Sequence, residues 1–240
     1  SRVIHIDLDS TEFNKHGLTS VNIKADVGDV LRTLLCNLEG FTPDPAWMMR
    51  LNSFKSKCCC DFDYDGVPIK PQKVMHEINK LIDDDTIVTT DVGQNQMWAM
   101  HCLNIKRPRQ MISSGGFGTM GLGLPSAIGA KAACPDKKVL TVTGDGGLLM
   151  VVQELATAIQ EDLPVTICLM NNGWLGMVRQ WQKLFWSKRY SATKLYDSNP
   201  DFVKLAEAFG ANGIRIERPS EIGDALKRSM NSGETCLIDI

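Results

Sequence analysis

The sequence has no apolar run close to the ~18 residues that a membrane-spanning helix needs, and its net charge is small. Its 240 residues include 26 Lys or Arg and 28 Asp or Glu, a formal charge of −2 at pH 7. A chain without a basic excess is not expected to bind nucleic acid or an anionic membrane surface. The first residues also lack the pattern of a secretory signal. We therefore predict a cytoplasmic protein with no nucleic-acid partner and no membrane partner.

Metal-chelating cysteine pairs are absent as well. Of the eight cysteines, Cys58, Cys59 and Cys60 are adjacent and do not match the CxxC spacing of metal sites. We assign these three no role and place them in a solvated linker. The other five stand singly in apolar segments, where a buried free thiol is the usual state: Cys36, Cys102, Cys134, Cys168 and Cys236. This pattern predicts reduced cysteines in an intracellular protein.

What the sequence does contain is an alternation of strand-like and helix-like segments. This alternation predicts an α/β fold with a doubly wound parallel sheet. The expected strands are 3–8, 21–24, 86–90, 138–143, 165–170, 213–216 and 236–240. The expected helices are 27–38, 71–82, 96–103, 122–133, 149–159, 175–185, 201–209 and 220–230.

The same pattern divides the chain into three regions. Residues 1–38 are too few to close a core of their own and are similar to the tail of a preceding α/β domain. Residues 39–70 include Pro43 and Pro68 and have weak periodicity, which predicts a linker. Residues 71–240 are predicted to form one complete domain.

Two short strings follow two of the expected strands. Gly-Asp-Gly around Asp145 follows 138–143, and the pair Asn171-Asn172 follows 165–170. Each string alone is common in turns. Neighbouring parallel strands lie ~4.8 Å apart, so Asp145 and Asn172 should lie side by side at the carboxyl ends, where open α/β sheets bind ligands. A carboxylate and an amide oxygen suit Mg²⁺, which completes its coordination with phosphate and water oxygens. The two strings together predict a magnesium-diphosphate site.

The segment Asp91–Gln96 is a second candidate for phosphate binding. It leaves an expected strand and opens a helix. Backbone amides at such a helix start attract phosphate, and Gln94 and Asn95 offer side-chain donors. The alternative is an ordinary strand–helix turn capped by Asn95.

The segment Ser113–Gly121 contains a GxGxxG string at Gly116, Gly118 and Gly121. Such a string also occurs in dinucleotide-binding sites. Residues 109–113 make a poor buried strand, however, so we favour another role. In that role the backbone approaches a flat heterocycle closely, with Met120 as an apolar support.

An apolar stripe follows the Asn pair on one face of the helix expected at 175–185. Its members are Trp174, Met177, Val178, Trp181, Leu184 and Phe185. Such a stripe usually packs into a core. Here the first turns of the helix must also lie beside the predicted diphosphate site.

Taken together, these segments resemble one family, the large catalytic subunit of acetolactate (acetohydroxyacid) synthase. The resemblance runs from about Pro71 to Ile240. It is carried by VGQNQMWA (92–99), SSGGFGTMGLGLPSAIGA (113–130), GDGG (144–147), QELATA (153–158), NNGWLGMVRQWQKLFW (171–186) and NPDFVKLAEAFG (199–210). The GDG and NN strings are similar to those of thiamine diphosphate enzymes in general, whereas GMVRQWQ is similar to this member of the family.

The resemblance implies a fold, cofactors, a reaction and partners. The fold is the diphosphate-binding domain of thiamine diphosphate enzymes. The cofactors are thiamine diphosphate and Mg²⁺, with FAD in the full-length enzyme. The reaction joins pyruvate to a second pyruvate or to 2-oxobutanoate with loss of CO₂, in branched-chain amino-acid biosynthesis. The implied partners are the 2-oxo acids, further copies of the full-length chain in a dimer or tetramer, and a regulatory small subunit.

The resemblance also implies roles for single residues. Mg²⁺ would be held by Asp145, Asn172 and the backbone carbonyl of Trp174. The diphosphate would be held by Gly93, Gln94, Asn95, Gly146 and Gly147. The aminopyrimidine ring would rest on Gly118, Met120 and Met177. Trp181 would line the pocket of the acceptor substrate.

One part of the family's machinery has no counterpart in this sequence. The catalytic Glu of the family belongs to an N-terminal domain supplied by a partner subunit, and no segment here is similar to that domain. We therefore assign no catalytic residue and expect the chain to be inactive alone. Two alternatives remain: a related thiamine diphosphate-dependent decarboxylase or acetyltransferase, and a non-catalytic cofactor-binding module.

Overall fold

The computed structural model describes residues 2–57 and 64–240. The chain divides into two compact units, Ser1–Cys58 and Cys59–Ile240, which we treat separately. Cys58, Cys59 and Cys60 lie outside the described residues. The predicted boundaries at 38 and 70 stay a prediction.

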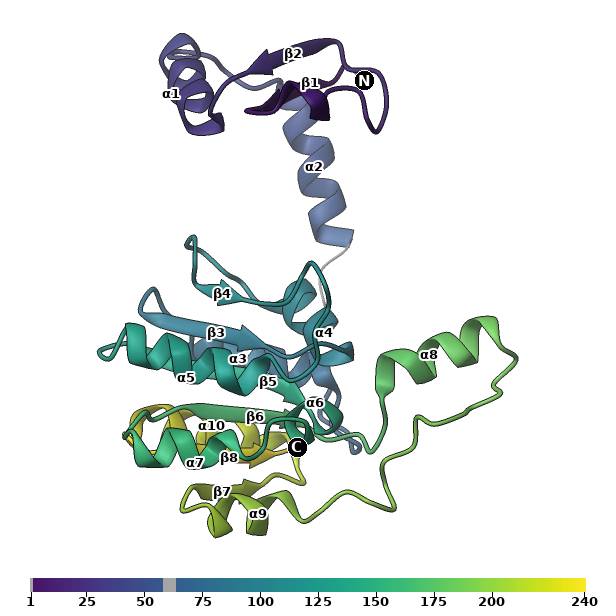
Figure 1. Cartoon of the computed structure of the whole chain (residues 1–240), viewed down its shortest axis with the longest axis vertical. Coiled ribbons are helices and arrows are strands. Elements are labelled where there is room, and N and C mark those ends of the chain that lie inside the picture. The colour runs from purple at the N-terminus through teal and green to yellow at the C-terminus, as the bar shows by residue number, and fades with distance from the viewer. Residues whose placement is uncertain (1, 58–63) are drawn as a thin grey trace. The chain divides into compact units, whose positions relative to one another are not determined.

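The first unit contains two strands and two helices (Figure 1). Strands β1 (Ile4–Asp7) and β2 (Val21–Lys24) pair in parallel, and helix α1 (Val27–Asn37) follows with Asp26 as its N-cap. These three elements match the predicted ones. Helix α2 (Pro45–Lys57) was not predicted. The prolines of this region were interpreted as breaks, whereas proline at the first position of a helix is compatible with the helix.

The second unit is built around a six-stranded sheet in which every pair is parallel. The order is β4-β3-β5-β6-β8-β7. The strands are β3 (Thr86–Thr90), β4 (Met111–Ile112), β5 (Lys138–Gly144), β6 (Thr166–Met170), β7 (Asn212–Arg215) and β8 (Cys236–Asp239). The predicted α/β parallel sheet is confirmed.

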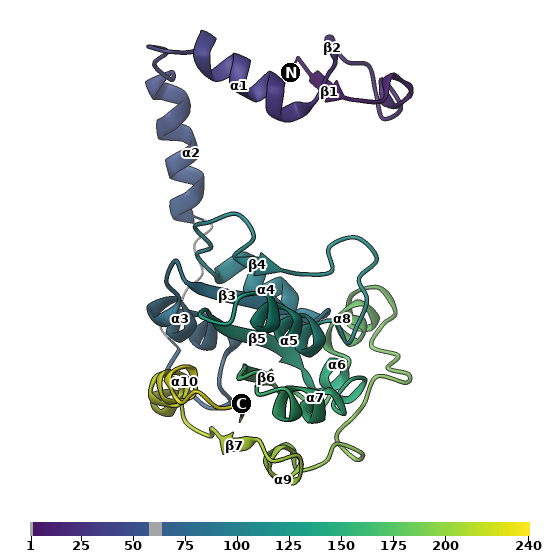
Figure 2. The ribbon, with the colours of Figure 1, turned by 60° about the vertical axis from the view of Figure 1, so that its left-hand side comes forward.

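Helices cover both faces of this sheet. The helices of this unit are α3 (Pro71–Leu81), α4 (Gln94–Cys102), α5 (Gly123–Ala133), α6 (Asp145–Leu149), α7 (Glu154–Gln160), α8 (Gly176–Phe185), α9 (Phe202–Ala208) and α10 (Ile222–Asn231), of which α8 does not pack on the sheet. Figure 2 shows α3 and α10 on one side and α5, α7 and α9 on the other. Among residues 2–57 and 64–240, no helix combines the length and apolar character needed to cross a membrane.

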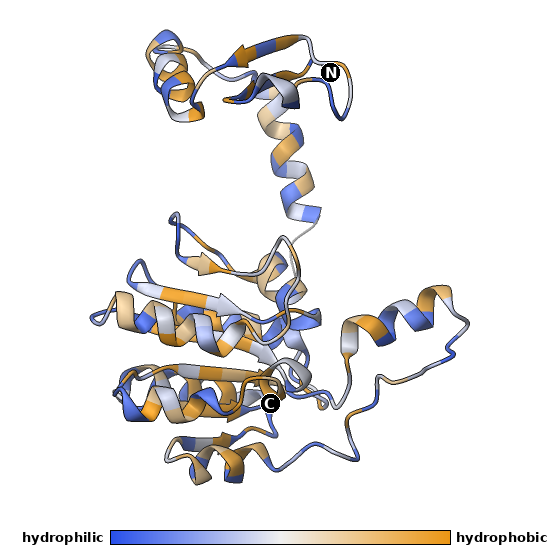
Figure 3. Cartoon of the chain, viewed as in Figure 1, coloured by the Kyte–Doolittle hydropathy of each residue, from blue (hydrophilic) through white to orange (hydrophobic). Residues whose placement is uncertain are grey.

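The alternation of side chains along the strands explains the two faces. On β6, Cys168 and Met170 pack with α3, α4 and α10, while Ile167 and Leu169 pack with α5, α7 and α9. Successive residues of a strand point to opposite faces, so a strand covered on both faces is apolar at nearly every position. In Figure 3 the central strands accordingly carry the hydrophobic colour.

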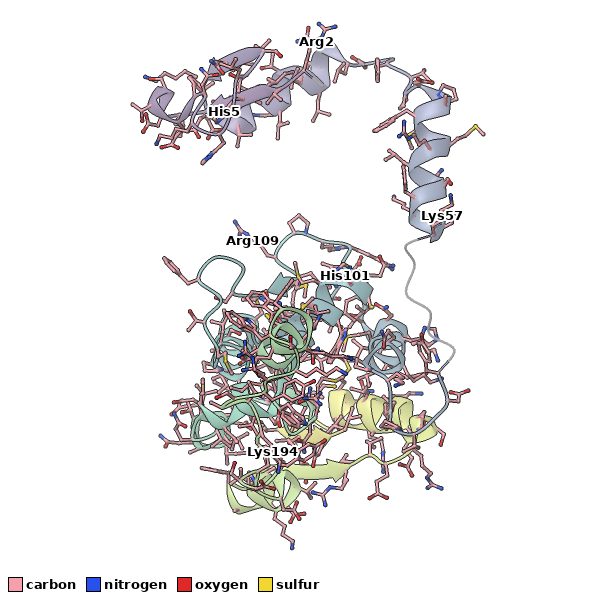
Figure 4. The ribbon with its side chains drawn as sticks, turned by 90° about the vertical axis from the view of Figure 1, so that its right-hand side faces the viewer. Arg2, His5, Lys57, His101, Arg109 and Lys194 are labelled. Atoms are coloured by element: carbon pink, nitrogen blue, oxygen red, sulfur yellow. The ribbon has the colours of Figure 1, made fainter. Side chains whose placement is uncertain are left out.

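One predicted helix differs from the structure, and one short strand was missed. The single helix expected at 149–159 is two short helices, α6 and α7, because the chain turns between them at Val151. β-Branched residues lower helix propensity, and Val151 packs against Gly121 instead. Strand β4 was not predicted. It is a two-residue edge strand whose approach turns at the exposed Arg109, labelled in Figure 4, with φ of +63°.

The interpretation of the single cysteines is correct only in part. Cys168 and Cys236 are buried free thiols, as predicted, and burial raises the pKa of Cys168 to about 12. Cys36 is free but exposed. The prediction of a free thiol is wrong for Cys102, which is disulfide-bonded. An apolar neighbourhood in sequence predicts burial but not whether a second sulfur lies within reach in space.

Candidate functional site

A cavity of about 160 Å³ opens at the carboxyl ends of the strands of the second unit. Strand β4 lies on one side of β3 and β5 on the other, so the cavity sits at the point where the strand order reverses. Open α/β sheets bind ligands at such a point. Its lining comes from the segments that follow β3, β4, β5 and β6: Val92, Gly93, Gln94, Asn95, Trp98, Gly118, Met120, Gly144, Asp145, Gly146, Gly147, Met170, Asn172, Trp174, Leu175, Gly176, Met177 and Val178.

The structure brings nearly all of the predicted site residues into this one cavity. The predicted metal, diphosphate and ring contacts all lie in its lining. Trp181 does not line it: this side chain is 57% exposed on α8, one turn beyond Met177. Trp98 and Leu175 line the cavity without having been singled out, and Val178 lies there as expected for the first turns of α8.

Asp145 is the one carboxylate among the described residues of the lining. It directly follows β5 and is 1% exposed. Burial raises the pKa of its carboxyl, while hydrogen bonds from Asn199 and from the backbone of Gly146 and Gly173 lower it. A buried carboxylate whose charged form is disfavoured by burial gains from a cation placed beside it.

Asn172 and Trp174 provide two further oxygens next to Asp145. The Oδ1 atom of Asn172 accepts a hydrogen bond from the backbone nitrogen of Trp174 at 2.9 Å. This turn fixes the amide and keeps one lone pair of Oδ1 free. Among the described residues, no hydrogen bond ends on the carbonyl oxygen of Trp174. One carboxylate, one amide oxygen and one carbonyl fit Mg²⁺, which takes few protein ligands and completes its octahedron with phosphate and water.

The start of α4 forms another part of the cavity wall. Gly93 has φ of +141°, and a Cβ there would lie 2.9 Å from Asn95 Oδ1, so this turn requires glycine. The Asn95 side chain, predicted as a donor to phosphate, has other partners in this structure. Its Nδ2 donates to the carbonyls of Asp91 and Val142, at 3.0 and 3.1 Å, and ties β3 to β5. Asn95 lines the cavity with its amide hydrogens already used.

Gln94 connects this wall to α8. Its Nε2 donates to Gln180 Oε1 at 2.8 Å. A Cβ on Gly176 would lie 2.3 Å from Gln94 Oε1, so the first turn of α8 packs directly against the Gln94 amide, which would have to shift to admit a side chain. This direct packing on Gln94 explains why the start of α8 lies beside the cavity, as predicted.

Asp91 is a residue whose importance the sequence analysis missed. Its carboxylate is fully buried and accepts hydrogen bonds from the backbone nitrogens of Gly121 and Gly123, each near 3.0 Å. These bonds fasten the glycine-rich loop, which carries Gly118 and Met120, to the end of β3. Asp91 directly follows a strand, as Asp145 does, and this position could have indicated that it lies beside the site.

We expect Gly147→Ala to destabilise the domain. A Cβ at Gly147 would lie 2.4 Å from Asp91 Oδ1, and the bonds to the glycine-rich loop prevent Asp91 from moving away. Overpacking of this kind costs roughly 1–3 kcal/mol of unfolding free energy. Urea denaturation measures the loss.

The matched control for Gly147 is Gly129→Ala. Gly129 is exposed within α5, and a Cβ there meets nothing within 4 Å. Alanine in an exposed helix interior should stabilise the domain by about 0.5–1 kcal/mol. Equal effects of the two substitutions would contradict the proposed contact with Asp91.

A stack of aromatic and cationic groups holds the segment after α8. The Arg179 guanidinium lies 4.1 Å from the Trp174 ring centre and 4.9 Å from that of Tyr190. Tyr196 meets the Trp174 ring edge-on at 5.8 Å. These contacts hold the Trp174 ring, and an indole ring offers no oxygen to Mg²⁺, so the metal ligand proposed at this residue is its backbone carbonyl.

The exposed stripe on α8 contradicts the usual expectation that such a stripe packs into a core. Trp181, Leu184 and Phe185 are 57%, 62% and 74% exposed, and no residue of α8 is buried. Figure 1 shows α8 standing away from the sheet. Within the described residues this face is uncovered.

Known proteins are similar to this chain in sequence. The family description "Thiamine pyrophosphate enzyme, C-terminal TPP binding domain" matches residues 91–240. The chain is 44% identical to a probable acetolactate synthase large subunit of Methanococcus aeolicus, over 100% of this chain and 42% of that relative. It is also 44% identical to one of Methanocaldococcus jannaschii, over 100% and 42%, and 42% identical to the acetolactate synthase large subunit of Haemophilus influenzae, over 100% and 43%. The chain thus spans less than half the length of these curated relatives.

Proposed function

The chain belongs to the thiamine pyrophosphate (thiamine diphosphate) enzymes, whose C-terminal cofactor-binding domain it carries, and we propose that it forms the diphosphate- and Mg²⁺-binding part of an acetolactate synthase. The observation that carries this proposal is the convergence of Asp145, Asn172 and the Trp174 backbone in one cavity with the start of α4 and the glycine-rich loop. The names of the 42–44% identical relatives support the choice of reaction.

Each wall of the cavity has a separate task in this proposal. Asp145, Asn172 and the Trp174 carbonyl hold Mg²⁺. Backbone nitrogens at Gly93 to Asn95 and at Gly146 and Gly147 bind the diphosphate, since successive backbone N–H groups form anion sites. Gly118, Met120 and Met177 support the aminopyrimidine ring as apolar contacts.

The proposed reaction is the decarboxylative condensation of pyruvate with pyruvate or 2-oxobutanoate. When bound, thiamine diphosphate supplies the electron sink for decarboxylation. The residues of this chain bind and orient it through the metal and the diphosphate. FAD, a dimer or tetramer of the full-length form, a regulatory small subunit and a cytoplasmic location belong to the same proposal and rest on the family resemblance.

Binding and product analysis test this proposal. Calorimetry should show that thiamine diphosphate binds the chain with Mg²⁺ and not with EDTA, whereas equal binding in EDTA would contradict the metal site. A form of the enzyme that turns over pyruvate should release acetohydroxy acids. Free acetaldehyde would instead identify a decarboxylase, and binding without turnover in every form would identify a non-catalytic module.

We expect Trp181→Leu to change substrate preference in a form that turns over pyruvate. Trp181 is exposed beside the cavity, where a large flat side chain can wall an acceptor pocket. One methylene in an apolar pocket is worth ~1–3 kcal/mol, so a loss of roughly tenfold in preference for 2-oxobutanoate is expected. Competition between the two acceptors measures it.

Trp186→Leu is the control for Trp181. Trp186 is equally exposed, at 58%, but follows the last residue of α8. It should leave the product ratio unchanged. An unchanged ratio in Trp181→Leu would exclude Trp181 from the acceptor pocket.

A further inference from the structure

Asn199 makes a direct contact with Asp145 from a distant part of the sequence. It lies just before α9, 54 positions after Asp145. Its Nδ2 donates to Asp145 Oδ2 at 2.8 Å and to Asn171 Oδ1 at 3.4 Å. Both amide hydrogens are therefore used, and the amide faces the end of β5.

In this orientation the Oδ1 atom of Asn199, which is buried, is left without a hydrogen bond among the described residues. A flipped amide would place Oδ1 against the acceptor oxygens of Asp145 and Asn171. The orientation seen is therefore the one that donates to Asp145, even though a buried acceptor without a partner is unfavourable.

Other contacts keep Asn171 and the start of α9 in place. Asn171 Nδ2 donates to Asp239 Oδ1 at 2.9 Å, and Asp239 pairs with Arg215 at 3.3 Å. Arg215 also pairs with Asp201 at 2.7 Å, and Asp201 caps α9. Asn199 is thus held between the ends of β6, β7 and β8 and helix α9. Because these contacts hold Asn199 in place, its side chain can fix the orientation of the Asp145 carboxylate.

We propose that Asn199 is a positioning residue that holds the Asp145 carboxylate in the orientation in which it ligates Mg²⁺. The proposal rests on the proposed function, because it takes Asp145 to be a metal ligand. A carboxylate bound at one oxygen by a rigid donor cannot rotate freely, so the direction of its remaining lone pairs is fixed. Partners of this kind orient metal ligands in many sites.

The test compares two variants of Asn199 in the 240-residue chain. Asn199→Ala removes the donor, and Asn199→Leu removes it while keeping a side chain of similar size. Calorimetric titration with Mg²⁺ at saturating thiamine diphosphate should show a roughly 10–100-fold loss of metal affinity in both, the range typical for such partners. Circular dichroism should show both variants folded.

Phe202→Leu is the control for loosening of the same segment. Phe202 is fully buried and anchors α9, so this variant lowers the melting temperature without touching the contact between Asn199 and Asp145. It should retain the metal affinity of the wild type. Loss of affinity in Phe202→Leu equal to that in Asn199→Ala would overturn the positioning role.

The outcomes separate this inference from the function on which it rests. A wild-type chain that binds no Mg²⁺ with thiamine diphosphate overturns both. A wild-type chain that binds the metal, together with Asn199 variants that bind it equally well, overturns the positioning role alone. A loss confined to the two Asn199 variants supports it.

Discussion

Replacing Asp145 by Ala is expected to abolish the Mg²⁺-dependent binding of thiamine diphosphate. Asp145 provides the one carboxylate among the described residues that line the cavity. Without it, Asn172 and the Trp174 carbonyl offer only neutral oxygens to a divalent cation. The loss should exceed the roughly 10–100-fold that removal of an outer partner of a metal ligand causes. Calorimetry with thiamine diphosphate and Mg²⁺ measures it.

Asp145→Asn separates metal binding from folding. Burial disfavours the charged form of Asp145 and raises its pKa. A neutral amide of the same size avoids the cost of burying a charge but replaces one oxygen that accepts hydrogen bonds. We therefore expect the metal-free variant to stay folded, yet fail to bind the metal. Asp197→Ala, an exposed carboxylate paired with Lys194, should change neither property. Cofactor affinity that still depends on Mg²⁺ in Asp145→Asn would refute the assigned metal ligand.

The sequence was sufficient for the part of the site that depends on parallel-sheet geometry. Asp145 and Asn172 could be placed together because each directly follows one of two neighbouring strands, β5 and β6, and the carboxyl ends of parallel strands meet at one edge. The same rule applied to Asp91 after β3, where its contacts with the glycine-rich loop could have been anticipated.

The sequence was not sufficient to predict the hydrogen-bond partners of side chains that have several possible partners. The Asn95 amide was expected to donate to phosphate but donates to two buried carbonyls, since an unpaired buried carbonyl is unfavourable. Asn199 is 54 positions from Asp145, and no local pattern brings the two together. Helix α2 was missed because Pro45 begins it rather than interrupting it.

We expect the 240-residue chain alone to form no acetolactate from pyruvate, even when it is saturated with Mg²⁺ and thiamine diphosphate. The family resemblance requires a carboxylic acid beside the aminopyrimidine ring. In the described residues the cavity lining contains no glutamate, and its one carboxylate, Asp145, is the proposed metal ligand. Glu154 lies in the first turn of α7 and accepts a hydrogen bond from Thr157. Glu154 does not line the cavity, and Asp145 is the proposed metal ligand, so we expect neither side chain to serve the ring.

A colour assay for acetoin, formed from acetolactate in acid, tests this expectation against a heat-inactivated sample and a complete acetolactate synthase. The measurement is informative only when calorimetry shows the cofactor bound, because inactivity then reflects a missing acid rather than an empty site. Steady product formation by the chain would overturn the prediction. We would then test the neighbouring cleft as the source of the acid, because Glu217 shares its lining with Gln94 and Asn172. Glu217→Gln would abolish that activity if Glu217 supplies the proton, and would leave it unchanged if another group does.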